Sequence, residues 1–221
     1  MDRSDTTFKK IQNGDSVTSA AFDAGYESLS GFNDSFKSVF GVSPSNSKNK
    51  LIIDLTRFET PLGTMFAGAT EQGICLLEFT DRRMLETEFK QLTKLLNATI
   101  VLGENPHFIA LYEQLNEYFN GKRKEFTIPL VTPGSAFQQA VWKELQNIPY
   151  GTTRSYKQQA FALKNIDAVR AVANANGMNR IAIIIPCHRV IGTDGSLTGY
   201  GGGLWRKKWL LDLENEYQLK L

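Results

Sequence analysis

The segment IAIIIPCHRVIG, residues 181–192, carries the strongest structural and chemical signal in the sequence. Its apolar run predicts a buried strand, which ends at Pro186 because proline cannot donate a ladder hydrogen bond. Cys187 and His188 therefore emerge at the end of a rigid element, which is a suitable mount for a reactive group. An imidazole beside a thiol can take the thiol proton, directly or through a water molecule, and leave a nucleophilic thiolate. The alternative is a buried structural cysteine followed by a surface histidine.

The composition of the whole chain excludes several protein classes. Of 221 residues, 42% are apolar and 22% are charged, which rules out a collagen-like, disordered or coiled-coil protein. No apolar run approaches the roughly 20 residues that span a bilayer, and the N-terminus has no apolar signal core, so we expect no membrane association. Two cysteines cannot build a disulfide framework, which favours a cytoplasmic location. Two cysteines and two histidines are a poor basis for a zinc site, so we expect neither a metal nor another cofactor.

Charge is unevenly distributed along the chain. Residues 1–50 hold six Lys/Arg and six Asp/Glu, and residues 51–130 hold eight against eleven, a net charge of −3. Residues 131–221 hold eleven against six, a net charge of +5. An anionic partner such as nucleic acid would prefer this last part, although ordinary scatter of surface charge is the alternative.

The pattern of apolar residues divides the chain into four segments. Residues 1–44 are predicted to form a short all-α segment, and the polar residues 45–50 a linker. Residues 51–133 are predicted to form a small α/β domain, because the strand-like runs LIIDLTRF, GTMFAGA and GICLLEF precede two helical stretches. Residues 134–221 are predicted to be mostly helical. The expected fold class is therefore α+β.

Helices are predicted near 84–96, 108–120, 137–148, 156–163, 168–176 and 205–217. In the third of these, one face is apolar and consists of Phe137, Val141, Trp142 and Leu145. The fourth and fifth are joined by LKNID, which is compatible with a helix-turn-helix.

Pro186-Cys187-His188-Arg189-Val190 resembles the signature of the O6-alkylguanine-DNA alkyltransferases, and the resemblance extends in register over about residues 51–221. It implies an RNase H-like fold for residues 51–133 and a DNA-binding, active-site domain with a helix-turn-helix for residues 134–221. The implied activity is irreversible transfer of a methyl group from O6-methylguanine in double-stranded DNA to Cys187, and O4-methylthymine stays open as a second substrate. Each chain would act once, as a monomer.

The resemblance also implies three groups of site residues. They are catalytic (Cys187, His188, Glu214, Asn179 and Tyr156), DNA-contacting (Arg170, Ala171 and Tyr156) and base-pocket (Tyr200, Gly201 and Val190), with no metal ligand. Asn179 would orient the active-site turn, and Glu214 would complete a Cys-His-water-Glu relay. Each position also has a structural alternative: Tyr156 as a core aromatic residue, Glu214 as a solvated charge and Asn179 as a turn residue.

Some of these residues have more specific implied roles. Arg170 would hold the space vacated by the nucleotide, which must be rotated out of the duplex. Tyr156 would crowd the adjacent phosphate, and its hydroxyl would protonate N3 of the departing base. Gly201 stands where many members of the family carry Ser, which predicts a looser pocket or a changed tolerance for bulky alkyl groups. Small residues on the 168–176 helix would permit close approach to the minor groove or pack against the core (Ala168, Ala171, Ala173 and Ala175).

Other chemistry-bearing residues are expected to be structural. Cys75 lies in an apolar strand without a base and is predicted to be a core residue. His107 follows Pro106 in a loop and is predicted to be exposed and inert. Lys122-Arg123-Lys124 is predicted to be solvated surface.

Residues 16–44 are similar to the second helix-turn-helix of AraC-type regulators, on Ala24-Gly25-Tyr26, Phe36-Lys37 and Gly41-Val42-Ser43-Pro44 among others. The order of this partial module and the alkyltransferase region resembles the Ada family. The first helix-turn-helix and the four-cysteine zinc domain of that family are missing, and a net charge of zero argues against strong phosphate binding. We therefore interpret residues 1–44 as a remnant or an auxiliary DNA contact.

Three other functions are alternatives to alkyl transfer. An Ada-like transcription regulator of an alkylation response is the main alternative. An alkyltransferase-like protein that marks lesions without transfer would lack the cysteine, whereas Cys187 is present. A cysteine hydrolase is disfavoured because no oxyanion-hole motif accompanies the Cys-His pair.

Overall fold

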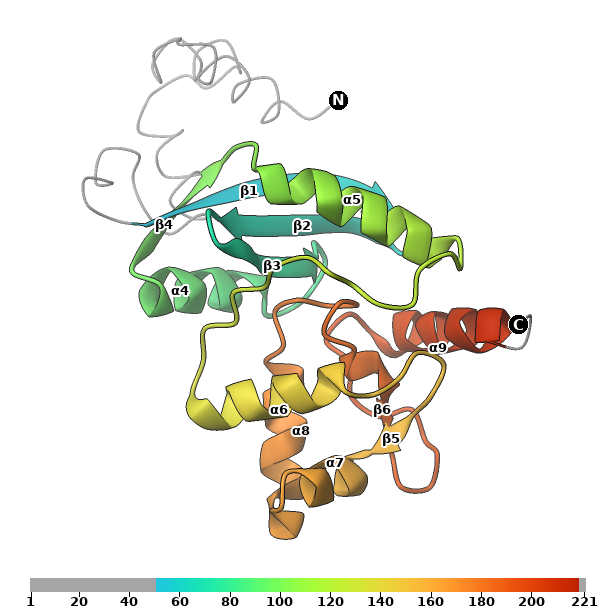
Figure 1. The fold of residues 1–221 in the computed structure, drawn as a ribbon. Helices are drawn as coiled ribbons and strands as arrows, with labels where there is room; N and C mark the ends of the chain where they lie inside the picture. Colours follow the sequence, from blue (N-terminus) through green and yellow to red (C-terminus); the bar gives the residue numbers. More distant parts are fainter. Residues whose placement is uncertain (1–50, 219–221) are drawn as a thin grey trace, which may run out of the picture.

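The structure, a computed structural model, describes residues 51–218 (Figure 1). The segments expected for residues 1–44 and 45–50 lie outside the described residues. The first half of the described chain is built on a four-stranded sheet of β1 (Leu51–Thr60), β2 (Gly63–Thr70), β3 (Gly73–Phe79) and β4 (Ala98–Leu102). Their order is β3-β2-β1-β4, in which β4 is parallel to β1 and the other pairs are antiparallel.

The three strands predicted from the sequence are confirmed as β1, β2 and β3, whereas β4 is not predicted from the sequence. Its five residues, ATIVL, form a short apolar run without alternation, which cannot be distinguished from a helix segment by periodicity. β4 follows α4 (Leu85–Leu95) directly, and the left-handed φ of 47° at Asn97 makes the break between them. The other helix of this half is α5 (Pro106–Phe119), which is capped by Asn105.

The two faces of the sheet contribute to different cores. One face of the sheet packs against α4. The core between them consists of Ile53, Leu55, Cys75, Leu76, Phe89, Leu92, Ala98 and Ile100. Cys75 is 1% exposed, so the prediction of a core cysteine is confirmed. His107 is half-buried rather than exposed, because its Nε2 lies 3.1 Å from the Glu71 carbonyl oxygen. Arg123 in the short basic run pairs with Glu117 at 2.6 Å, while its two lysine neighbours are exposed.

The second half contains four α-helices and several short elements within the described residues: α6 (Ala136–Gln146), β5 (Arg154–Ser155), α7 (Tyr156–Ala162), η2 (Ile166–Ala168), α8 (Val169–Gly177), η3 (Cys187–Arg189), β6 (Val190–Ile191) and α9 (Leu204–Gln218). The predicted helices are thereby confirmed, with ends shifted by one or two residues. Ser135 and Ser155 begin α6 and α7 with capping boxes, each closed by a glutamine three residues later. Of the predicted α6 face, Phe137 is 36% exposed; the buried face begins one turn later, at Val141.

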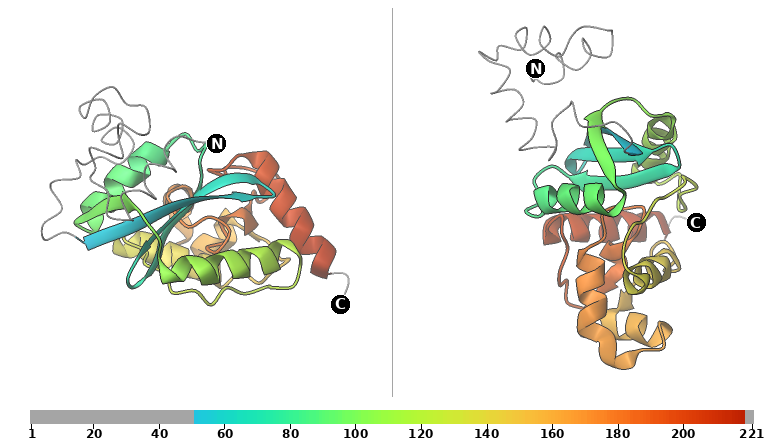
Figure 2. Two further views of the ribbon diagram at one scale, coloured as in Figure 1. Left: turned by 90° about the horizontal axis from the view of Figure 1, so that it is seen from above. Right: turned by 90° about the vertical axis from the view of Figure 1, so that its left-hand side faces the viewer.

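Helices α6, α7 and α8 are joined by buried polar contacts. Trp142 Nε1 donates a hydrogen bond of 2.8 Å to the Ala175 carbonyl, and Asn176 Nδ2 donates one of 2.8 Å to Gln159 Oε1. Helix α9 lies to one side of this group, at a level between it and the sheet (Figures 1 and 2). One hydrophobic core includes residues from β2, β3 and α5 as well as from α6, α8 and α9, so the two halves are packed on each other.

The outer edge of β3 is covered by two later segments of the chain. Ile74 N donates to the Pro129 carbonyl at 2.9 Å, and a Cβ on Gly73 (φ 148°) would lie 2.3 Å from that same oxygen, so only glycine fits there. Further along β3, Leu77 N donates to the Arg180 carbonyl and Ala182 N donates to the Leu77 carbonyl, both at 2.8 Å. This second contact fixes the start of the segment that leads to Cys187.

Residues 181–185 are buried as expected, but the predicted strand is wrong. Only Ile181 forms a bridge with β3, and Ile183 has a left-handed φ of 71°. Asn179 makes this turn possible, since its side chain accepts from Ile181 N (3.0 Å) and donates to the Ile185 carbonyl (2.8 Å). A side chain thus supplies hydrogen bonds that a strand would have obtained from a neighbour.

No helix among residues 51–218 is long and apolar enough to cross a membrane. In the same part of the chain, no group of three or more His, Cys, Asp or Glu side chains is placed to hold a metal ion.

Candidate active site

Cys187 is half-buried and lines a cavity of about 420 Å³ where the two halves of the protein meet. Four of the other residues predicted from the sequence line the same cavity: Tyr156, Arg170, Tyr200 and Gly201. Val190 is fully buried and does not line the cavity. It lies in β6, where it pairs with Arg154 of β5. Ala171 is exposed on α8 outside this lining.

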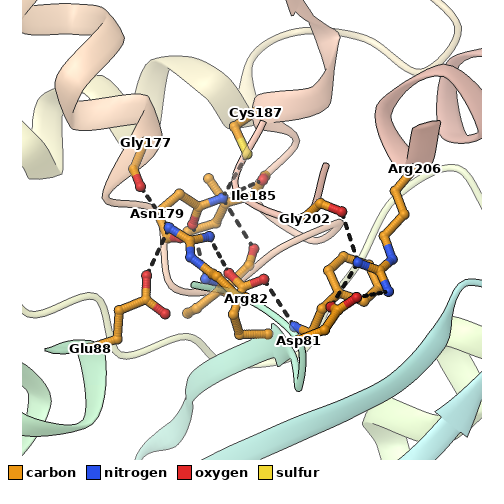
Figure 3. Close-up of polar contacts among 12 residues, drawn as sticks. Asp81, Arg82, Glu88, Gly177, Asn179, Ile185, Cys187, Gly202 and Arg206 are labelled. Carbon is orange, nitrogen blue, oxygen red and sulfur yellow. Dashed lines mark hydrogen bonds and ion pairs between the residues drawn. The ribbon is translucent and has the colours of Figure 1, made fainter. Parts of the chain in front are cut away.

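Asn179 connects the turn directly to the thiol. Its Nδ2 lies 3.3 Å from Cys187 Sγ in addition to its bonds within the turn (Figure 3). Burial raises the pKa of the Cys187 thiol, and the Asn179 hydrogen bond opposes this shift by favouring the thiolate. The Glu78 carboxylate adds to the rise, whereas the Arg82 and Lys207 charges oppose it. The resting cysteine is therefore a thiol that needs a base.

His188 and Glu214 form a fully buried pair next to this cysteine. His188 Nε2 is 2.9 Å from Glu214 Oε1, and both side chains are 0% exposed, which excludes a surface histidine and a solvated glutamate. Burial lowers the pKa of His188, and Glu214 only partly offsets this shift, so the imidazole is neutral near pH 7. Burial alone would raise the pKa of Glu214, but His188 and Arg189 hold it below its ordinary value.

Because Glu214 is a carboxylate, it accepts a hydrogen bond from His188 Nε2–H, which leaves His188 Nδ1 as the unprotonated nitrogen. His188 Nδ1 is buried and has no hydrogen-bond partner among the described residues. Glu214 is held from other sides by Tyr118 Oη at 2.7 Å, Gly151 N at 3.0 Å and the Arg189 guanidinium at 2.9 Å. The pair therefore has fixed positions and one free nitrogen, which belongs to the residue that follows Cys187 in the chain, so its arrangement could serve as a base.

The loop of residues 197–203 forms another wall of the cavity and is held in place by hydrogen bonds from α7 and α9. Tyr156 Oη donates a hydrogen bond of 3.0 Å to the Thr198 carbonyl. Lys207 on α9 is 0% exposed, and its Nζ donates to the carbonyls of Val190 and Thr198 at 2.5 and 2.8 Å. Burial lowers the pKa of Lys207 to about 8. Lys207 is not predicted as a site residue from the sequence, although its spacing from Leu210 and Glu214 places all three on one helix face.

Arg82 is a second residue of the site that is not predicted from the sequence. It follows β3, and its guanidinium pairs with Glu78 at 2.5 Å and Glu88 at 2.8 Å (Figure 3). Its Nη2 also donates a hydrogen bond of 2.7 Å to the Gly177 carbonyl at the end of α8. Burial raises the pKa of Glu78 to about 7 and that of Glu88 to about 8, although Arg82 opposes both shifts. No local pattern predicts this cluster, since the contact joins residues 95 positions apart.

The outer surface of α8 continues from the cavity. Arg170 and Ala171 are exposed, Ala168 and Ala173 are half-buried, and Ala175 is 3% exposed within the core. Of the small residues predicted either to permit close approach to DNA or to pack in the core, Ala175 therefore packs in the core, whereas Ala171 is accessible from outside.

The described residues match known proteins over most of their length. The family 6-O-methylguanine DNA methyltransferase, DNA binding domain, matches residues 136–216, and the ribonuclease-like domain of 6-O-methylguanine DNA methyltransferase matches residues 55–132. The constitutive methylated-DNA–protein-cysteine methyltransferase of Bacillus subtilis (strain 168) is 41% identical over 161 residues, covering 72% of this chain and 93% of that protein. The methylated-DNA–protein-cysteine methyltransferase of Mycobacterium tuberculosis (strain ATCC 25618 / H37Rv) is 56% identical over 135 residues, covering 61% and 79%.

Solved structures agree with these matches. Mycobacterium tuberculosis OGT in complex with DNA superposes with a TM-score of 0.63 at 40% identity, covering 76% of this chain and 94% of that chain. The O6-methylguanine-DNA methyltransferase of Pyrococcus kodakaraensis strain KOD1 superposes with a TM-score of 0.54 at 27% identity, covering 73% and 98%. The chain therefore belongs to the 6-O-methylguanine DNA methyltransferase family.

Proposed function

We propose that this protein repairs O6-methylguanine in DNA by moving the methyl group irreversibly to Cys187 Sγ. The observation that carries the proposal is the arrangement around that sulfur. Cys187 lines a cavity, its sulfur accepts a hydrogen bond from Asn179, and the next residue in the chain, His188, forms a buried pair with Glu214. An unrelated structural cysteine would not require a base held by a buried carboxylate.

The reaction follows from the protonation states of these groups. The Cys187 proton moves to His188 Nδ1, directly or through a water molecule, and Glu214 stabilises the resulting imidazolium. The thiolate attacks the methyl carbon, so that an S–C bond forms while the C–O6 bond breaks and its electron pair stays on guanine. Tyr156, whose pKa is raised by burial and which is therefore a neutral phenol, donates its proton to N3 of the departing base. The product is a thioether that none of these groups can reverse, so each chain acts once.

Access to the lesion requires that the nucleotide leave the duplex. We assign the α7–η2–α8 unit as a helix-turn-helix that lies against the minor groove, with Ala171 at the close approach. Arg170 lies on this exposed surface at the cavity mouth and takes the place of the rotated base. Tyr200 and Gly201 form the wall that closes over it. Residues 51–133 serve as an RNase H-like support, and O4-methylthymine is a second substrate to be tested.

The Ada-like alternative depends on residues 1–44. These residues lie outside the described part of the chain and outside both family matches. No observation in residues 51–218 favours regulation over repair, so repair is the single function proposed.

The test uses a duplex that contains one O6-methylguanine and follows its conversion to guanine. The wild-type protein should convert one lesion per chain and then stop. Cys187→Ala should convert none, whereas Cys75→Ala, the matched control, should convert as many as the wild type. Conversion by the Cys187→Ala protein, or repeated turnover by the wild type, would contradict the proposal.

A further inference from the structure

We propose that Arg82 determines which O6-alkyl groups this protein accepts, because its guanidinium forms the part of the pocket wall that a side chain at position 201 would otherwise form. The inference rests on the proposed function, in which Cys187 receives the alkyl group. It replaces the expectation that Gly201 leaves the pocket looser.

The space next to Gly201 is filled by Arg82. A Cβ at position 201 would lie 2.2 Å from Arg82 Nη1 and 2.5 Å from Arg82 Cζ, much closer than real Cβ contacts. Gly201 is not among the residues with a positive φ, so its backbone conformation would accept a side chain. The reason for glycine at this position is therefore the guanidinium and not the backbone.

Arg82 is part of the cavity and not merely behind it. Its side chain is only 7% exposed, yet it lines the same cavity as Cys187, Tyr200 and Gly201. Its Nη1 also lies 3.5 Å from the carbonyl oxygen of Asn179, the residue that donates to the Cys187 sulfur. A group transferred to that sulfur must therefore fit in a space that Arg82 bounds.

The guanidinium is held in one position. Glu78 and Glu88 bind it from the sheet half, and the Gly177 carbonyl binds it from the end of α8. A free surface arginine would swing aside for a bulky group, but one that is held by the Glu78 and Glu88 side chains and by a backbone carbonyl is a rigid wall. Its neighbour Arg83 is exposed, which provides a matched control.

The experiment measures single-turnover transfer from duplexes that carry O6-methylguanine or the bulkier O6-benzylguanine. The ratio of the two rate constants is compared between variants, because loss of folded protein changes both rates equally. Arg82→Ala should raise the benzyl-to-methyl ratio by about tenfold or more, the scale on which pocket size discriminates. Arg83→Ala should leave it unchanged.

A second arm tests whether positions 82 and 201 share one space. Gly201→Ala should slow transfer when Arg82 is present and should have no effect in the Arg82→Ala protein. If Arg82→Ala does not yield folded protein, Arg82→Met retains the apolar stem and serves the same comparison. Equal ratios in all folded variants, or equal effects of Gly201→Ala in both backgrounds, would overturn the inference. Failure of the wild type to transfer methyl would instead reject the proposed function.

Discussion

At the scale of single residues, the reactivity of Cys187 depends on two opposed effects. Burial raises the pKa of its thiol, whereas the hydrogen bond from Asn179 Nδ2 favours the thiolate. Asn179 also holds the buried turn that presents the sulfur. One amide thus couples backbone geometry to nucleophilicity.

Asn179→Asp should slow methyl transfer at pH 7 by about tenfold or more, because a carboxylate cannot donate to the sulfur and places a negative charge beside the thiolate. Since the variant raises the pKa of Cys187 further, the deficit should shrink as the pH rises toward 9. The measurement is the single-turnover rate against pH, with Asn116→Asp at an exposed position of α5 as the control. A deficit that does not change with pH would mean that Asn179 has only a structural role.

Glu214→Gln should destabilise the protein by about 3–5 kcal/mol at pH 7, because it leaves the buried Arg189 charge without its carboxylate. The pKa of Glu214 is lowered in the folded state, so its stabilising effect is present above the ordinary value of 4.5 and is lost as the pH falls below it. Urea unfolding of wild type and variant at several pH values checks this expectation, with the exposed Glu113→Gln as the control. An equal difference at pH 7 and pH 3 would contradict it.

At the scale of secondary-structure elements, sequence patterns predict most of the framework. β1–β3 and the helices are signalled by alternation, caps and glycine stops, and these local signals survive in the fold. β4 is not predicted because its short apolar run is ambiguous, and residues 181–185 are mistaken for a strand because their hydrogen bonds come from the Asn179 side chain. Burial is predictable from hydrophobicity, but the choice between a strand and a turn depends on the side-chain amide of Asn179, just before this segment.

Helix α9 positions the loop of residues 197–203 through Lys207. Lys207→Met would leave buried carbonyl groups at Val190 and Thr198 without a donor, at a cost of about 1–3 kcal/mol. We expect faster hydrogen exchange in this loop and slower transfer than in the wild type. The exposed neighbour Lys208→Met is the control. Unchanged exchange in the loop of the Lys207→Met protein would show that the lysine does not order it.

At the scale of the whole molecule, the active site lies in the second half and is completed from the first half by Arg82 and Tyr118. The motif Pro186–Val190 predicts the nucleophile and its base, and the predicted site residues include five of those that line the cavity: Tyr156, Arg170, Cys187, Tyr200 and Gly201. Arg82 is not predictable from the sequence, because it reaches the Gly177 carbonyl from the opposite half of the fold. The edge of β3 likewise binds residues 180–182 across the boundary.

These contacts and the shared core predict that the two halves unfold together. The three tryptophans, Trp142, Trp205 and Trp209, all report on the second half, whereas hydrogen exchange of β1 and β2 reports on the first. Urea unfolding should give coincident midpoints for the two probes. Separate midpoints would show that the halves are independent domains.

The most direct test of the account is to locate the methyl group after reaction with O6-methylguanine DNA. Trypsin cleavage after Arg57, Arg82, Arg180 and Arg189 places Cys75 and Cys187 on separate peptides, residues 58–82 and 181–189. Peptide mass spectrometry should find one methyl group on the 181–189 peptide and none on the 58–82 peptide. Methyl on the Cys75 peptide, or repaired DNA with neither peptide modified, would contradict the claim that Cys187 is the acceptor.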